Sequence, residues 1–223
     1  LFNIVVTLPT ILRDGVPGGR ILLILAHGAG LPMDAPFMTK LVELLLATPE
    51  VEVWRFEFPY MEARRHGGSK RPPDRPAILT KTWVSVVELS RSEGRTHIVC
   101  GGKSMGGRIA SMVVDDLGAS GLVCLGYPFH PKGKPEKLRT EHLTALRTPT
   151  LICQGERDGL GTWNEVNTYD LSPNIEFHWS IDGDHDLKPR KTSGSTHDAN
   201  LSEAVSAISR FLRSLELPSK LLH

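Results

Sequence analysis

The sequence has little cysteine and no long apolar run. Its three cysteines, Cys100, Cys124 and Cys153, each lie within an apolar stretch, so we expect buried thiols in a reducing compartment and neither a disulfide framework nor a metal cluster. The longest apolar run, residues 21–26, is far too short to span a membrane. The first ten residues lack the basic region and small-residue cleavage site of a secretory leader. These absences favour a cytoplasmic protein without a membrane partner.

An excess of charge of either sign is also lacking. The chain carries 26 lysines and arginines against 25 aspartates and glutamates, which gives a net charge of +1. This balance argues against nucleic acid as a partner, because overall electrostatic attraction would be weak. A chain of 223 residues is long enough for one large α/β domain. We predict a single domain over residues 1–223 that acts on a small molecule, as a monomer or a homodimer.

Short apolar runs alternate with segments of helical periodicity. Strand patterns occupy residues 21–28, 52–59, 97–102, 121–127, 150–155 and 175–181, and we expect an antiparallel edge strand over residues 2–9. Helical patterns occupy residues 35–48, 77–89, 105–117 and 201–215. The alternation predicts an α/β protein with a mostly parallel, twisted sheet and helices on both faces.

The stretch "GGKSMGGR", residues 101–108, allows two interpretations. A phosphate-binding loop needs a glycine five residues before Gly102, but His97 stands there, inside a predicted strand. A serine nucleophile needs a strand, a tight turn and a helix, with small residues two before and two after the serine. Gly102 and Gly106 flank Ser104 at these offsets. The spacing therefore favours Ser104 as a nucleophile and leaves Lys103 without an assigned role.

The partners that a serine nucleophile requires follow in the expected order. Asp158 comes after the predicted strand 150–155, and His185 comes after the last predicted strand, as the acid and the base of a Ser-Asp-His triad do. The glycine-rich turn "AHGAG" precedes a helix, which is where an oxyanion donor is expected. We expect the backbone N–H groups of Ala29 and Met105 to form the oxyanion hole.

Other residues compete for these roles. Four further carboxylates lie in the same turn as Asp158 or beside the histidine: Glu156, Asp182, Asp184 and Asp186. A residue adjacent to His185 points away along the chain and is poorly placed to reach Nδ1. Among the histidines, His178 lies inside a predicted strand and His197 at the cap of the last helix, so both are expected to be structural. For His27 we expect a hydrogen bond that shapes the oxyanion turn.

Residues 61–76 are rich in arginine, glycine and proline, which predicts a loop without helix. Because this loop follows the carboxyl end of a strand, we expect Tyr60 and Met61 to line the pocket. Arg64 and Arg65 are candidates to pair with a substrate carboxylate or phosphate. The alternative is a solvated basic loop, which is the more usual role of surface charge.

Five stretches in order resemble the α/β-hydrolase superfamily: "LAHGAG", "FEFPYM", "GGKSMGGR", "QGERD" and "GDHDLKPRK". They are most similar to its small, lidless, dienelactone-hydrolase-like branch, which includes testis-expressed and acetyltransferase-complex proteins. The resemblance covers residues 21–212 and implies an α/β-hydrolase fold with the triad and oxyanion hole named above. Dienelactone hydrolases proper have a cysteine where this chain has Ser104, so the resemblance favours ordinary ester, thioester or amide cleavage.

The sequence thus predicts a serine hydrolase of small esters or thioesters that forms an acyl-enzyme on Ser104 and needs no metal or organic cofactor. About twenty residues lie between Phe129 and Thr148, too few for a helical lid. Two alternatives remain open. One is a non-catalytic scaffold or complex subunit that keeps the fold, and the other is an acyltransferase or perhydrolase using the same triad.

Overall fold

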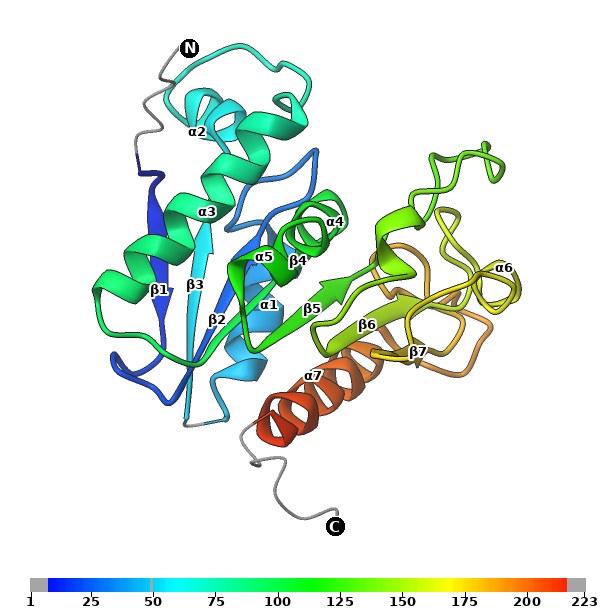
Figure 1. Cartoon of the computed structure of the whole chain (residues 1–223). Coiled ribbons are helices and arrows are strands. Elements are labelled where there is room, and N and C mark those ends of the chain that lie inside the picture. The colour runs from blue at the N-terminus through cyan, green and yellow to red at the C-terminus, as the bar shows by residue number, and fades with distance from the viewer. Residues whose placement is uncertain (1–7, 49, 216–223) are drawn as a thin grey trace.

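The computed structural model describes residues 8–48 and 50–215, through which one seven-stranded sheet runs (Figure 1). The strands are β1 (Ile11–Asp14), β2 (Ile21–Ala26), β3 (Val51–Phe56), β4 (Ile98–Lys103), β5 (Gly121–Leu125), β6 (Thr150–Gly155) and β7 (Ile175–Ser180). Their order in the sheet is β1-β3-β2-β4-β5-β6-β7. β1 pairs antiparallel with β3, and every other pairing is parallel.

The central strands are buried at every position, from β2 through β6. Strands covered on both faces need nearly continuous apolar sequence, which explains runs such as Ile21–Ala26. Because all of these strands are parallel, their carboxyl ends meet at one edge of the sheet. Loops that follow β2, β4, β6 and β7 are therefore brought together at that edge.

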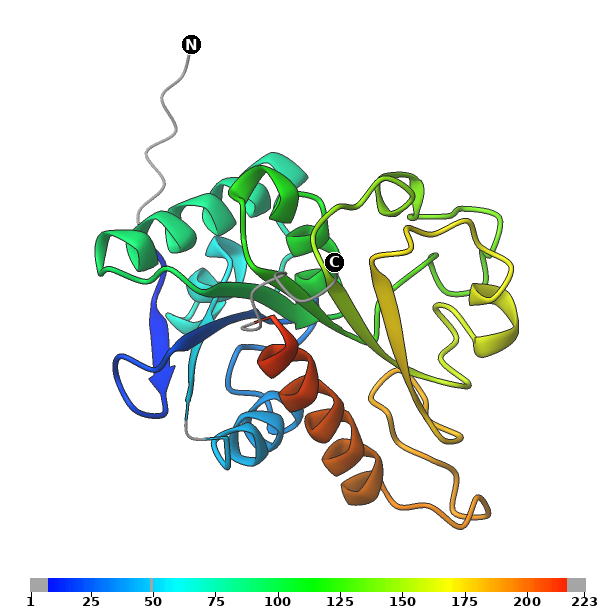
Figure 2. The same cartoon turned by 60° about the horizontal axis from the view of Figure 1, so that its bottom comes forward.

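Helices cover both faces of the sheet, as Figure 2 shows. One face carries α1 (Pro36–Leu45) and α7 (His197–Ser214), and the other carries α3 (Pro76–Ser92), α4 (Met105–Ser111) and α5 (Val114–Leu117). The short helices α2 (Pro59–Arg65) and α6 (Trp163–Val166) and the 3₁₀ helix η1 (Glu141–Leu143) follow β3, β6 and β5. No helix in the described ranges is long and apolar enough to cross a membrane.

The predicted fold class is confirmed, with three local differences. In the described part the antiparallel edge strand is β1 at Ile11–Asp14; of the strand predicted over residues 2–9, residues 2–7 lie outside that part, and residues 8 and 9 are not in a strand. Residues 61–65, predicted as loop, belong to α2, because Pro59 at its first turn favours helix initiation. The helix predicted over residues 105–117 is broken after Ser111, where Met112 and Val113 bond three residues back instead of four.

All three cysteines are buried, as predicted. The end of α7 packs at the opposite edge of the sheet from the loops that follow the parallel strands. A Cβ placed on Gly121, the first residue of β5, would meet Leu215 at 2.5 Å and Phe211 at 3.3 Å. The final helix therefore ends against the amino-terminal end of a central strand.

Candidate active site

Ser104 stands in a strained turn between β4 and α4. Its φ and ψ are 53° and −117°, and a positive φ is rare for a residue with a side chain. The turn brings its backbone against β2, whose Ala26 pairs with Gly102 in the parallel ladder. A Cβ on Gly102 would lie 2.5 Å from the carbonyl oxygen of Ala26, and one on Gly106 would lie 2.6 Å from that of His27. The two glycines are needed because the backbones approach so closely.

The glycine-rich turn after β2 lies directly beside this serine. A Cβ on Gly28 would be 3.7 Å from the Cβ of Ser104, so the two turns are in contact. Ala29 follows in the same turn, and Met105 is the first residue of α4, whose first N–H groups have no partner within the helix. Both N–H groups thus belong to segments that meet at Ser104. The Tyr60 hydroxyl donates to the carbonyl of Ala29 at 2.9 Å and so helps to hold this turn in place.

His27 shapes the same turn, as the sequence predicts. Its Nε2 accepts a hydrogen bond from the backbone N–H of Phe58 at 3.1 Å, and its Nδ1 lies 2.6 Å from the carbonyl oxygen of Gly28. This pattern needs a neutral ring with the proton on Nδ1. Burial lowers the pKa of His27, which favours that neutral form.

Asp158 and His185 are in contact across the ends of β6 and β7. The Nδ1 atom of His185 lies 2.7 Å from Oδ2 of Asp158. The Asp158 carboxylate is fully buried and also accepts from the side-chain amide of Gln154 and the backbone N–H of Leu160, each at 2.9 Å. A buried carboxylate with this many donors is fixed in position.

The competing carboxylates are engaged elsewhere. Asp182 pairs with Arg157 at 2.8 Å and with Arg190 at 2.6 Å. The Arg190 guanidinium holds the pKa of Asp182 at about 2. Asp184 accepts backbone N–H groups of its own loop, Glu156 accepts the N–H of Asp182, and Asp186 pairs with Lys103. None of these four carboxylates contacts His185 Nδ1.

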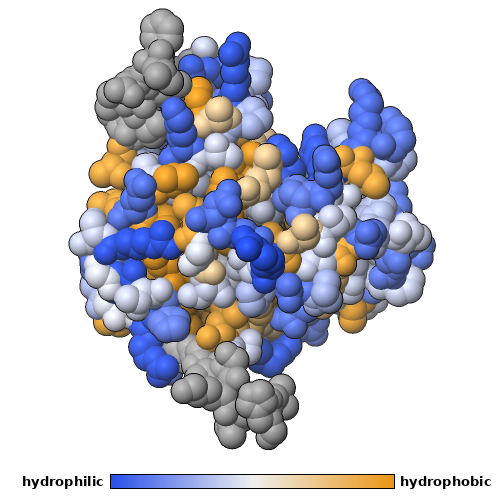
Figure 3. All heavy atoms as spheres, in the orientation of Figure 1, coloured by the Kyte–Doolittle hydropathy of each residue, from blue (hydrophilic) through white to orange (hydrophobic). Residues whose placement is uncertain are grey.

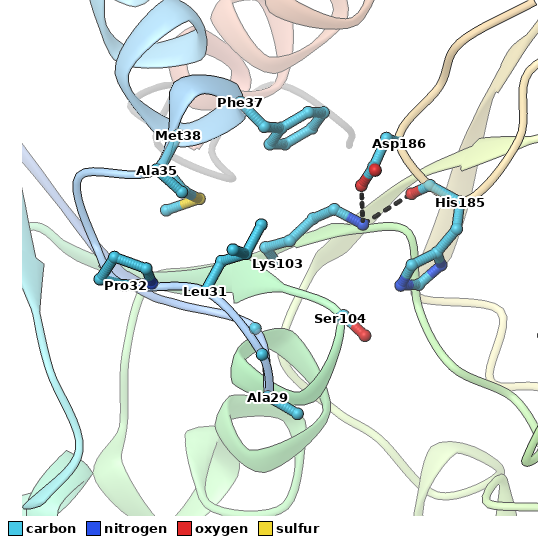
Figure 4. Close-up of a pocket in the computed structure, with 12 residues that line it drawn as sticks. Ala29, Leu31, Pro32, Ala35, Phe37, Met38, Lys103, Ser104, His185 and Asp186 are labelled. Atoms are coloured by element: carbon cyan, nitrogen blue, oxygen red, sulfur yellow. Dashed lines mark hydrogen bonds and ion pairs between the residues drawn. The ribbon is translucent and has the colours of Figure 1, made fainter. Parts of the chain in front are cut away.

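Lys103 has a role in the structure that its sequence position did not indicate. Its ammonium donates to the carbonyl oxygen of His185 at 2.6 Å and lies 3.1 Å from Oδ1 of Asp186 (Figure 4). The side chain is 9% exposed, and burial lowers its pKa. Gly126 makes room for both groups, because a Cβ there would lie 3.0 Å from Nζ of Lys103 and 3.2 Å from Nδ1 of His185. Lys103 thereby joins the serine turn to the histidine loop.

A cavity of about 290 Å³ opens beside Ser104 and His185. Figure 4 shows both residues at one end of it and an apolar wall at the other. That wall comes from the turn after β2 and from α1, and consists of Leu31, Pro32, Ala35, Phe37 and Met38. No hydrogen bond in the described part of the chain involves Ser104 Oγ. Contacts between nucleophile and base are often long without a substrate and shorten when one binds.

The four predicted substrate-binding residues lie beside this cavity and do not line it. Tyr60 and Met61 are buried, and Tyr60 contacts the turn after β2. Arg65 pairs with Glu57 at 2.6 Å and with Asp34 at 2.8 Å, and these two carboxylates raise its pKa. Arg64 donates to the carbonyl of Gly30 at 3.3 Å. In this structure both arginines hold the chain around the turn after β2.

Sequence reasoning missed Gln154 and Gly126. Gln154 is fully buried and donates to Asp158, while its carbonyl oxygen accepts the N–H of Tyr127 at 2.7 Å. The sequence did contain an indication of Gln154. A glutamine near the end of an apolar strand places a polar amide in the interior, where it needs hydrogen-bond partners. The left-handed φ of 62° at Gly126 has no such signal beyond the glycine itself.

A mostly parallel sheet with helices on both faces and a strained serine turn after its central strand defines an α/β protein of the hydrolase class. The sequence agrees: residues 19–213 match the family described as "Alpha/beta hydrolase domain", and the chain belongs to that family. A search of curated proteins found no match.

Solved structures share the fold at low sequence identity. An alpha-beta serine hydrolase homologue from Coxiella burnetii superposes with a TM-score of 0.67 and 17% identity, covering 93% of this chain and 91% of that one. A serine hydrolase without a lid from Xanthomonas campestris gives 0.64 and 17%, covering 94% and 90%. Dienelactone hydrolase from Anabaena variabilis gives 0.63 and 17%, covering 91% and 89%. The chain thus has the lidless α/β-hydrolase fold.

Proposed function

We propose that the protein is a serine hydrolase that cleaves small esters or thioesters through an acyl-enzyme on Ser104. The observation that carries the proposal is the 2.7 Å contact between Asp158 and Nδ1 of His185, whose ring borders the same cavity as the strained serine. Family membership supports hydrolysis in general. The residues and the substrate class are our inference.

In the proposed reaction, Nε2 of His185 takes the proton of Ser104 as Oγ attacks the acyl carbon. Asp158 keeps the other ring proton on Nδ1 and stabilises the imidazolium that forms. The N–H groups of Ala29 and Met105 receive the oxyanion, aided by the positive end of α4. The leaving group departs with the proton from His185. Water, activated by the same histidine, then releases the acid and regenerates Ser104.

The cavity favours a short apolar acyl group. Its apolar wall of Leu31, Pro32 and Phe37 offers little to a polar chain, and its volume of about 290 Å³ is at the lower end of small-molecule sites. The segment between β5 and β6 adds only the 3₁₀ helix η1 and no lid. We therefore expect hydrolysis of esters with short acyl chains in solution, without activation at a lipid surface.

Labelling with a fluorophosphonate probe tests the proposal. The wild type should form a covalent adduct, and Ser104→Ala should form none, while the exposed-site variant Ser206→Ala should label like the wild type. Hydrolysis of p-nitrophenyl butyrate should follow the same pattern. An unlabelled wild type would favour a non-catalytic scaffold, and labelling that persists in Ser104→Ala would assign the nucleophile elsewhere. Added alcohols or peroxide that divert the acyl group would favour the transferase or perhydrolase alternative.

A further inference from the structure

Two arginines near the proposed nucleophile, Arg108 and Arg139, form no ion pair with any residue of 8–48 or 50–215. Arg108 lies on α4 one turn after Ser104, and its N–H donates to the Ser104 carbonyl at 3.0 Å. Arg139 lies between β5 and β6, where its N–H donates to the carbonyl of Phe129 at 2.7 Å. Both side chains are partly buried. The two residues come from different segments, so their proximity is a product of the fold.

Hydrogen bonds tie these segments together. Oγ of Ser111 lies 2.7 Å from the carbonyl oxygen of Arg108 and 2.8 Å from Nε2 of His142. The Tyr127 hydroxyl donates to the carbonyl of Arg139 at 3.0 Å and lies 3.4 Å from the same Nε2 atom. We call Arg108, Arg139, His142 and Tyr127 the arginine cluster. These hydrogen bonds hold the backbone at Arg108 and the backbone at Arg139 in fixed positions relative to each other.

The charge of the arginine cluster is unbalanced. Within the described residues, neither guanidinium forms an ion pair with a carboxylate; Glu141, the neighbour of His142, is exposed and pairs with neither. The Nε atom of Arg108 is buried without a hydrogen-bond partner, and its Nη1 contacts only the sulfur of Met112, at 3.8 Å. Burial and then the Arg108 charge lower the pKa values of Arg139 and His142.

Such an arrangement is unfavourable unless an anion completes it. Two partly buried like charges repel each other, and an unpaired buried donor costs about 1–3 kcal/mol. By contrast, Lys103, Arg65 and Asp182 each have an oppositely charged partner. The arginine cluster differs from them in having donors that point to no acceptor.

We propose that the arginine cluster binds a phosphate group on the leaving-group side of the substrate. This inference rests on the proposed function. Two guanidinium groups match a phosphate monoester, which carries a charge of roughly −1.5 to −2 and accepts several hydrogen bonds. The position of Arg108, about 6 Å along the helix axis from Ser104, places the cluster within reach of a bound ester.

The positions of the two binding regions assign the phosphate to the leaving group. The apolar cavity is built from the α1 side, whereas Tyr127, Phe129 and Leu143 belong to the core on the α3 and α4 side. Figure 1 shows the segment between β5 and β6 rising beside α4, and Figure 3 shows the surface hollowed between them, with hydrophilic side chains gathered there. An acyl chain in the cavity would leave the rest of the substrate directed to the arginine cluster.

A matched pair of thioesters tests the proposal. Butyryl coenzyme A carries phosphates on its leaving group, and butyryl N-acetylcysteamine has the same thioester without them. In each, water adds to the acyl carbon, the carbon–sulfur bond breaks and the thiol takes the proton. Arg108→Gln and Arg139→Gln should each lower kcat/KM for the coenzyme A thioester at least tenfold more than for the neutral one. The matched control Arg147→Gln, whose side chain is 80% exposed, should keep the wild-type ratio.

Experiments with inorganic phosphate distinguish two ligands of the arginine cluster: a phosphate group carried by the substrate and free phosphate. It should inhibit hydrolysis of the coenzyme A thioester and raise the Tm of the wild type and of Ser104→Ala, but not of Arg108→Gln. A Tm increase without discrimination between the thioesters would overturn the substrate role and indicate a free phosphate ligand. No Tm increase and no discrimination would overturn the site itself. Because Ser104→Ala binds phosphate without chemistry, failure of the proposed hydrolase function is distinguishable from failure of this site.

Discussion

The two halves of the candidate site are held in different ways. The serine half consists of the turn after β2 and the turn between β4 and α4, and steric fit between backbones defines it: Gly102 and Gly106 pack against the carbonyls of β2. The histidine half consists of the loops after β6 and β7, and charged side chains define it: Asp182 pairs with Arg157 and Arg190.

The difference teaches which changes each half tolerates. Close backbone packing has no room for a side chain but does not depend on charge. Ion pairs and hydrogen bonds tolerate changes of volume but fail when one partner is removed. Substitutions of the serine half should therefore act on folding, and substitutions of the histidine half should act on geometry and rate.

The largest effect is expected from Asp158→Asn in the histidine half. The amide keeps the shape but can donate to Nδ1, which favours the wrong tautomer of His185, so kcat for p-nitrophenyl butyrate should fall roughly 10³- to 10⁴-fold. The exposed Asp170→Asn is the control and should retain wild-type kcat. A decrease below tenfold would mean that another group orients the histidine.

In the serine half, Gly106→Ala should destabilise the fold. The new Cβ would lie 2.6 Å from the carbonyl oxygen of His27, and rigid backbone cannot move aside, so the free energy of unfolding should fall by about 3 kcal/mol. Urea denaturation measures it. Gly159→Ala meets no atom within 4 Å and should change stability by less than about 0.5 kcal/mol. Equal stability of the two variants would contradict steric definition of this half.

Lys103→Met probes the junction of the halves. Without the ammonium, the carbonyl of His185 and the carboxylate of Asp186 lose their shared donor, and the histidine shifts relative to the serine. We expect kcat to fall about tenfold with KM unchanged, since displacements of this kind act on alignment. Lys103→Arg should recover part of kcat. If the exposed Lys188→Met loses as much, a general charge effect explains the result.

The smallest expected effect is on stability at acidic pH. Although charged side chains define the histidine half, the pH dependence should come from His27 in the serine half. His27 is buried with a lowered pKa, so below pH 6.5 the unfolded chain binds a proton that the folded serine half does not. The free energy of unfolding should therefore decrease as the pH is lowered, by at most about 1.4 kcal/mol per pH unit. Asp182, with its pKa at about 2, keeps its ion pairs throughout this range.

Urea denaturation at pH 7.5 and 5.5 measures this dependence, and His27→Gln should show a smaller decrease than the wild type. His142 and His178, whose pKa values burial also lowers, contribute equally in both proteins. An unchanged dependence in the variant would assign the acid sensitivity to them.

The sequence alone predicted most helices and strands and the order of the candidate site residues along the chain, because both depend on local sequence pattern. Apolar runs marked the strands, and Gly102 and Gly106 marked the turn of Ser104. The roles of Ser104, Asp158 and His185 remain predictions, and their geometry now supports them. Lys103 and Gln154 were missed because their partners, His185 and Tyr127, lie 82 and 27 residues away. The acid partners of Arg65, Asp34 and Glu57, are likewise brought to it only by the fold.

The packing of α7 has a practical consequence for attaching the protein to a surface. Leu215 lies against Gly121, at the amino-terminal end of β5, while Ser104 lies at the other end of the neighbouring strand. A tether joined after α7 would hold the molecule by the edge remote from the cavity. Immobilised in that orientation, the enzyme would present its open cavity to the bulk solution, where substrate arrives.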